Sequence, residues 1–181
     1  MSELKIFADN QPESALVHST DHEEIARHLG QFGIRFERWQ TRDDLPAGAD
    51  QDTVIRAYQS DIDRLCEEGG YQTVDVISLN PDHPDKETLR KKFLDEHRHS
   101  EDEVRFFVAG GGLFSLHIGD RVFEVLCQRG DLISVPADTP HWFDMGPNPD
   151  FIALRLFNNP DGWVANFTGS DIASKFSRLE N

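Results

Sequence analysis

The sequence predicts a mainly β protein with helices packed outside the β core, in the α+β class. After about residue 96, short β-type runs follow one another, separated by glycine, aspartate, asparagine and proline. This spacing is typical of a sandwich or a small barrel. Before that point, helical and strand patterns are mixed. The chain has 181 residues, which is enough for one domain with a sizeable core.

The N-terminal part contains three predicted helices. Residues 19–33 begin with helix-capping residue types and end in glycines, which indicates a short helix. Residues 52–70 carry apolar side chains near helical spacing before a double glycine, so one helix is expected there. Residues 83–96 have a proline near the start of a further helical pattern. Strands are expected over residues 34–40 and 71–79.

The second half of the chain should supply the barrel. The strand-like runs are "EVRFFVAGGG", "LFSLHIGD", "RVFEVLCQ", "DLISVPAD", "HWFDM" and "FIALRLF". A tight hairpin turn is expected at Gly119 and Asp120, and a short helix over residues 168–179. We expect residues 1–181 to form one domain, with an N-terminal mixed extension (about 1–95) packed on a barrel (about 96–167).

Composition limits the classes of partner. The formal net charge of −15 disfavours nucleic acid and anionic lipid surfaces as partners. No apolar run approaches the roughly 20 residues of a membrane span, and no signal peptide is visible. Cys66 and Cys127 are expected to be free thiols in a reducing compartment. We therefore expect a cytoplasmic protein. A monomer is also expected, although the sequence does not determine the oligomeric state.

The stretch that starts at Asp95, "DEHRHSEDEVRFFVAGGG", suggests half of a metal site. In a strand, residues two apart face the same side, so His97 and His99 can converge on one ion. In a continuous strand, Glu103 would lie about 13 Å beyond His99, too far to share that ion. The chain must therefore turn at Ser100–Asp102 and bring Glu103 back on the neighbouring strand.

A fourth ligand follows a distant strand-like run and a turn with prolines, at His141. Three imidazoles and one carboxylate favour Fe(II), Ni(II), Mn(II) or Co(II) over a structural zinc ion. A His-x-His pair alone in a polar loop is most often surface chemistry. Here a spaced carboxylate, a glycine-rich exit and a remote histidine together favour a metal site.

These residues resemble the two motifs of the cupin superfamily. The first motif, G-x5-H-x-H-x3-4-E-x6-G, is matched from His97 to Gly110, with Lys91 in place of the leading glycine. The second, G-x5-P-x-G-x2-H-x3-N, is matched from Gly130 to Met145. In the second motif Asp138 replaces the internal glycine and Met145 replaces the asparagine. The resemblance implies a cupin-type β-barrel, also called a double-stranded β-helix or jelly roll.

A closer resemblance covers nearly the whole chain. "GYQTVDVISL", "FLDEHRHSEDEVRFFVAGGGLFSLHIGD", "DLISVPADTPHWFDMG" and "NNPDGWVANFTG" look like the acireductone dioxygenase family. This implies a methionine salvage enzyme with one Fe(2+) or Ni(2+) per chain. It would cleave 1,2-dihydroxy-3-keto-5-methylthiopentene with O2. The iron form would give formate and 4-methylthio-2-oxobutanoate, and the nickel form methylthiopropionate, formate and carbon monoxide.

The same resemblance implies residue roles. The metal ligands would be His97, His99, Glu103 and His141. Arg105 would stabilise the substrate dianion, Glu96 would assist metal incorporation, and Asp102 would relay conformational change. Strand alternation independently puts Arg105 on the same face as Glu103, although a plain ion pair with a nearby carboxylate is the alternative.

A methylthio tail needs an apolar pocket. Candidates for its wall are Phe93, Phe107, Phe143 and Trp163, each of which could instead be ordinary core. Two other functions remain open at this level. One is a metal-dependent cupin isomerase or decarboxylase acting on a chelating hydroxy or keto acid. The other is a cupin binding module without catalysis.

Overall fold

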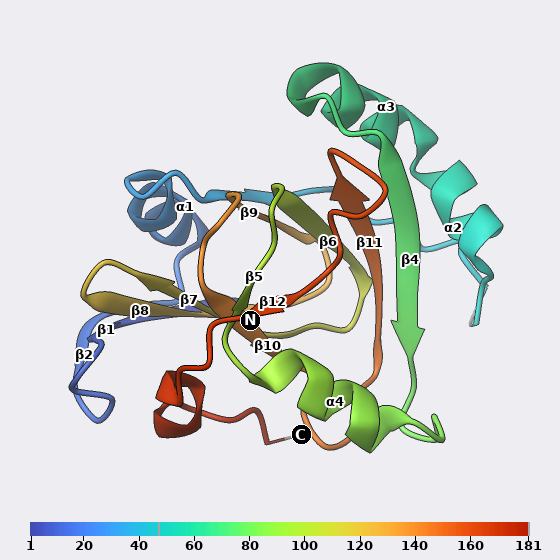
Figure 1. Cartoon of the computed structure of the whole chain (residues 1–181). Coiled ribbons are helices and arrows are strands. Elements are labelled where there is room, and N and C mark those ends of the chain that lie inside the picture. Colours follow the sequence, from blue (N-terminus) through green and yellow to red (C-terminus); the bar gives the residue numbers. More distant parts are fainter. Residues whose placement is uncertain (47, 181) are drawn as a thin grey trace.

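The computed structural model describes residues 1–46 and 48–180, and two antiparallel sheets face each other in it (Figure 1). The seven-stranded sheet has the order β12-β5-β10-β7-β8-β1-β2, and the five-stranded sheet β3-β9-β6-β11-β4. Its elements are β1 (Glu3–Ala8), β2 (Ala15–Ser19), α1 (His22–Gly30), β3 (Arg35–Arg38), α2 (Gln51–Ala57), α3 (Gln59–Gly69), β4 (Thr73–Leu79), α4 (Lys86–Leu94), β5 (His97–Arg98), β6 (Glu103–Ala109), β7 (Gly112–Ile118), β8 (Arg121–Cys127), β9 (Asp131–Val135), β10 (His141–Asp144), β11 (Phe151–Phe157), β12 (Asn166–Phe167) and the 3₁₀ helix η1 (Ile172–Lys175).

The main core lies between the two sheets, and strand alternation builds it. On β6, Phe107 joins the core between the sheets, whereas Val104 and Phe106 point to the outer face, where α2 and α3 cover them. On β10, Phe143 points inward, and Trp142 packs outward beside η1. Both β6 and β10 therefore present one face to the interior of the barrel and the other face to a covering helix.

The fold and the strand-like runs of the second half are confirmed. The N-terminal segment adds four strands to the two sheets: β1 beside β8, β2 beside β1, β3 beside β9 and β4 beside β11. This segment therefore builds sheet edges as well as packing helices on them. The organisation as a single domain stays a prediction. Within the described residues, no helix is long and apolar enough to cross a membrane.

The helix expected over residues 52–70 is divided in two. Tyr58 leaves the helical conformation, with φ −109° and ψ 17°, between α2 and α3. Its ring is fully buried with its centroid 5.2 Å from that of Phe106, and its hydroxyl accepts a hydrogen bond from Arg42 N at 2.8 Å. Packing of this one side chain on the sheet outweighs the local preference for a continuous helix.

In the glycine-rich corner after β6, Gly110 lies close to the backbone of Asp150. Alanine should therefore be less tolerated at Gly110 than at Gly119. Gly110 has φ +61°, and a Cβ there would overlap the carbonyl oxygen of Asp150. Gly119 also has φ +61°, but no atom lies within 4 Å of a Cβ placed there. The left-handed conformation costs a non-glycine residue about 1–2 kcal/mol, and overpacking adds about 1–3 kcal/mol.

We expect Gly110→Ala to lower the free energy of unfolding by about 3 kcal/mol, and Gly119→Ala by about 1 kcal/mol. Urea unfolding of the two variants beside the native chain measures both. Because the two glycines share the same φ, equal losses would show that the approach to Asp150 is of no energetic importance.

Candidate metal centre

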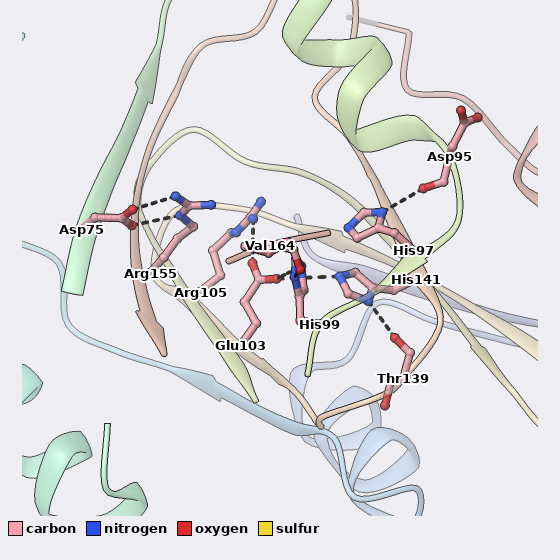
Figure 2. Close-up of polar contacts among 10 residues, drawn as sticks. All are labelled: Asp75, Asp95, His97, His99, Glu103, Arg105, Thr139, His141, Arg155 and Val164. Atoms are coloured by element: carbon pink, nitrogen blue, oxygen red, sulfur yellow. Dashed lines mark hydrogen bonds and ion pairs between the residues drawn. The ribbon is translucent and has the colours of Figure 1, made fainter. Parts of the chain in front are cut away.

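The four predicted ligands come from three strands and converge inside the barrel (Figure 2). His97 lies on β5, His99 directly follows it, Glu103 begins β6 and His141 begins β10. His141 is the antiparallel register partner of His97. All four residues are buried. We call these four residues the metal centre.

Each histidine of the metal centre is held by a backbone carbonyl at Nδ1. An Nδ1 that donates a hydrogen to a carbonyl leaves the lone pair on Nε2, which is the arrangement of a metal-binding imidazole. The carbonyls fix the rotation of the rings as well as their tautomers. The pairs are His97 with Asp95 O at 2.8 Å, His99 with Val164 O at 3.0 Å and His141 with Thr139 O at 2.8 Å.

The nitrogen atoms available on the three histidines lie within 4.8 Å of one another, as a shared metal ion requires. Burial, together with the neighbouring His141, lowers the pKa of His97 to about 4. The imidazole is therefore neutral at physiological pH and keeps the lone pair that a metal ligand needs. A donor set of three imidazole nitrogens fits a divalent ion such as Fe(II) or Ni(II).

Glu103 stands beside the histidines as an oxygen donor. Its Oε2 lies 3.1 Å from His99 Nε2 and 3.7 Å from His141 Nε2. Two donors bound at about 2.1 Å and at a right angle would lie about 3.0 Å apart, so these distances fit neighbouring ligands of one ion. Burial opposes ionisation of the Glu103 carboxyl, but Arg105, His141 and His99 outweigh it and hold its pKa well below the usual range.

The turn between His99 and Glu103 was predicted correctly, but its destination was not. We expected Glu103 on the strand next to the histidines, and that was wrong. β5 belongs to the seven-stranded sheet and β6 to the five-stranded sheet, so the chain crosses from one sheet to the other. The crossing lets ligands approach an ion from opposite walls of the barrel, which neighbouring strands of one sheet would not do.

This turn is tied to the turn before His141. Asp102 Oδ1 accepts a hydrogen bond from Ala137 N at 2.7 Å, and His99 O accepts one from Asp138 N at 2.9 Å. Asp138 has φ +60°, a left-handed conformation that explains the glycine of the cupin motif at this position. Sequence reasoning gave Asp102 no physical role. In the structure it links the two turns that carry ligands.

Arg105 is buried beside the metal centre. Its Nη2 donates to Glu103 Oε1 at 2.6 Å, which is the ion pair expected as the alternative role of this residue. Its Nε has no hydrogen-bond partner among the described residues. The guanidinium carbon lies 4.7 Å from the ring centroid of Phe143 and 4.9 Å from that of Phe114. The ion pair therefore leaves part of this cation available to a ligand.

A cavity of about 500 Å³ opens on the metal centre. Three of the predicted wall residues, Phe93, Phe143 and Trp163, line it. Phe107 is not among its lining residues. It is fully buried, and its ring packs behind those of Phe114 and Phe143. The remaining apolar walls, which sequence reasoning missed, are Val76, Ile77, Leu79, Leu89, Phe114 and Ala165.

A second arginine in the cavity was also missed. Arg155 lies on β11 opposite Arg105 in register, and Asp75 on β4 holds it through two hydrogen bonds of 2.6 and 2.9 Å (Figure 2). Burial lowers the pKa of Arg105, as does repulsion from Arg155, whereas Glu103 raises it. The signal in the sequence was a lone charge at an inward position of the apolar run "FIALRLF".

Glu96 lies next to His97 but faces the other way. Its carboxylate Oε1 accepts a hydrogen bond from Thr168 Oγ1 at 2.7 Å, and Oε2 lies 2.9 Å from His117 Nδ1. Strand alternation explains this direction. Among the described residues, the cluster with metal-ligand spacing contains His97, His99 and His141. Neither Glu96 nor Glu103 is part of it, but the Glu103 carboxylate lies 3.1 Å from His99 Nε2, whereas that of Glu96 is turned to Thr168 and His117.

Comparisons with known proteins agree with this architecture. The model of the ARD/ARD′ family matches residues 3–165. The chain is 65% identical to an acireductone dioxygenase of Alcanivorax borkumensis, over 98% of both chains. It is 62% identical to one of Pseudomonas aeruginosa over the full length of both. A solved acireductone dioxygenase from Bacillus anthracis, with a cadmium ion in its active center, superposes with a TM-score of 0.81 at 28% identity, covering 92% of this chain and 98% of that one.

Proposed function

The chain belongs to the ARD/ARD′ family of acireductone dioxygenases, and on this premise we propose that its metal centre holds one Fe(II) or Ni(II) ion and binds the acireductone. The observation that carries the proposal is the convergence of nitrogens from three buried histidines within 4.8 Å, with Glu103 beside them. The established reaction class of the family is cleavage of 1,2-dihydroxy-3-keto-5-methylthiopentene with O2 in methionine salvage.

The residues of the metal centre divide the work of holding the ion. The histidines supply three neutral donors, and Glu103 supplies one negative charge, so a divalent ion keeps a net charge of about +1. When bound, such an ion acts as a Lewis acid that favours the ionised, electron-rich form of the substrate's ene-diol oxygens. The backbone carbonyls at Nδ1 fix the orientation of each ring and would keep Nε2 directed at a bound ion.

Arg105 would hold the second negative charge of the substrate. A buried guanidinium beside an ene-diol lowers the pKa of the second hydroxyl and keeps the dianion in place. The free Nε is the donor available for this contact. Arg105 and the ion together give an anionic substrate a positive site inside a protein of net charge −15.

The cavity beyond the metal centre would take the methylthio tail. Phe93, Phe143 and Trp163 give it apolar walls, and an apolar tail gains about 25 cal/mol for each Å² removed from water. Phe107 supports this wall from behind, through Phe143. We assign the tail to these apolar walls because Arg105 and the predicted ligands supply the polar groups for the ene-diol in the same cavity.

Two supporting residues act at a distance from the ion. We propose that Asp102 transmits movements between the two ligand-bearing turns, because its carboxylate joins them through Ala137 N. For Glu96 we propose a part in metal incorporation, through its contacts with Thr168 and His117. We also propose that the enzyme is a cytoplasmic monomer that binds neither nucleic acid nor membranes. Its net charge of −15 supports the proposal that it binds neither nucleic acid nor membranes, because both carry negative charge.

Oxygen dependence tests the reaction class. With enzyme and acireductone in air-saturated buffer, we expect one O2 to be consumed for each substrate, as measured with an oxygen electrode beside an enzyme-free control. Under argon, turnover should stop. Sustained anaerobic conversion of the substrate would favour a metal-dependent isomerase or decarboxylase instead.

A further inference from the structure

Residues 163–168, here called the strap, run along the edge of the seven-stranded sheet beside the metal centre. Within this segment, β12 pairs with β5, so that Phe167 lies opposite His97 in register. Val164 O accepts the hydrogen bond from His99 Nδ1 at 3.0 Å (Figure 2). Trp163 and Ala165 line the cavity. The strap therefore orients one ligand and forms part of the pocket wall.

Apolar burial contributes little to holding the strap in place. Trp163 is 49% exposed, Val164 41% and Phe167 57%. The paired stretch is two residues long and lies at the edge of its sheet. Val164 N donates to Asp161 O at 3.1 Å, a contact within the local turn that does not tie the segment to the sheet. Segments with few buried apolar contacts open more readily than core strands do, so the position of the Val164 carbonyl also depends on an anchor to the sheet.

That anchor is Thr168, at the end of the strap. Thr168 N donates to Glu96 O at 3.1 Å, and Thr168 Oγ1 donates to Glu96 Oε1 at 2.7 Å. The other carboxylate oxygen of Glu96 contacts His117 Nδ1 on β7 at 2.9 Å, and His117 Nε2 lies 3.2 Å from Asp9 Oδ2. Thr168, Glu96 and His117 form a unit that we call the clasp.

The clasp is built on the side of β5 that faces away from the ion. Glu96 is 4% exposed, so its carboxylate depends on these two partners in place of water. A hydrogen bond to a buried carboxylate is charge-assisted and stronger than a bond between neutral groups. The clasp thus fastens an exposed edge segment to the interior of the sheet at the one point where the strap ends.

We propose that Thr168 is a positioning residue for the metal centre. Through Glu96 it holds the strap, the strap holds the Val164 carbonyl, and this carbonyl fixes the His99 ring with Nε2 toward the ion. The inference rests on the proposed function, because it requires His99 to be a ligand. It gives Glu96 a way to act on the metal without binding it, since both oxygens of its carboxylate are engaged in the clasp.

Metal release from the full chain loaded with Ni(II) tests this. Native protein, Thr168→Val and Thr168→Ser are mixed with a large excess of a coloured chelator, and the rate of Ni(II) transfer is followed by absorbance. Because partners that orient ligands are worth about 10- to 100-fold in metal affinity, Thr168→Val should release Ni(II) about 10-fold faster. Thr168→Ser keeps the hydroxyl and should stay close to the native rate.

Ser174→Ala is the matched control, because it removes a hydroxyl from the same terminal segment, where Ser174 Oγ donates to Asp171 O. It should release Ni(II) at the native rate. Hydrogen exchange of the strap amides should become faster in Thr168→Val, whereas that of β6 should not change. If Thr168→Val does not fold, Thr168→Ala takes its place as the variant without the hydroxyl. It is then compared with Thr168→Ser, which keeps the hydroxyl.

The outcomes distinguish a failure of the clasp from a failure of the proposed metal centre. Native rates of release and exchange in the variants without the hydroxyl would overturn the clasp. A native chain that takes up no Ni(II) would instead refute the proposed metal centre. If Thr168→Ser releases Ni(II) as fast as Thr168→Val does, the inference would also be overturned. The effect would then come from lost packing and not from the lost hydrogen bond.

Discussion

Replacing His141 with alanine is expected to remove the bound metal and, with it, the activity. His141 enters the centre from β10, far along the chain from the other ligands, and its register partner is His97. Without it, two histidines and Glu103 remain. Even the outer partners of metal ligands are worth about 10- to 100-fold in affinity, so loss of a ligand should exceed about 100-fold.

The metal content of purified His141→Ala, measured by elemental analysis after reconstitution, checks this prediction. His83→Ala is the control, because His83 lines the same cavity but lies outside the cluster with metal-ligand spacing. It should keep one metal per chain. A His141→Ala protein with native metal content and native turnover would refute the assignment of this ligand.

Replacing Arg105 with methionine is expected to leave the metal in place and to lower turnover by about 100-fold. Methionine keeps an unbranched side chain between Phe114 and Phe143, whereas the charge is lost. Removing one preorganised group that stabilises developing or full negative charge costs about 10²- to 10³-fold in turnover. Arg105→Lys restores the charge without the fork of donors, and should recover part of the rate.

The pH dependence of this variant separates a role in the dianion from a role in packing. If Arg105 lowers the pKa of the substrate's second hydroxyl, as proposed, its removal should raise that pKa. The rising limb of the pH–rate profile should therefore move to higher pH, and alkaline buffer should restore part of the activity. An unchanged profile and an unchanged rate would contradict the proposed role.

Much of the barrel could be predicted because its signals are local. The runs from Glu103 to Phe157 alternate or cluster apolar residues between clear turn signals, and every one of them is a strand. Alternation also placed Arg105 on the face of Glu103 correctly. The helix that Tyr58 interrupts could not be predicted in this way, since the cause is a contact with a distant strand.

The site shows the same limit. Strand alternation predicted that His97 and His99 share one face. Which sheet each strand joins is decided by long-range pairing, so the strand of Glu103 was wrongly expected beside the strand of the histidines. Phe107 has the correct parity for the cavity, yet Phe114 and Phe143 stand in front of it. The Val164 carbonyl has no side-chain signal at all, because any residue at that position supplies one.

The most direct test of the central claim is a metal titration of the native protein after a chelator has stripped it. Ni(II) or Fe(II) is added in steps without oxygen, and turnover of the acireductone with O2 is measured at each step. Activity should rise linearly with added metal and reach a plateau at one equivalent of metal per chain. The iron-loaded protein should give formate and 4-methylthio-2-oxobutanoate, and the nickel-loaded protein methylthiopropionate, formate and carbon monoxide. Full activity in the stripped protein, with metal content confirmed to be negligible, would contradict the account.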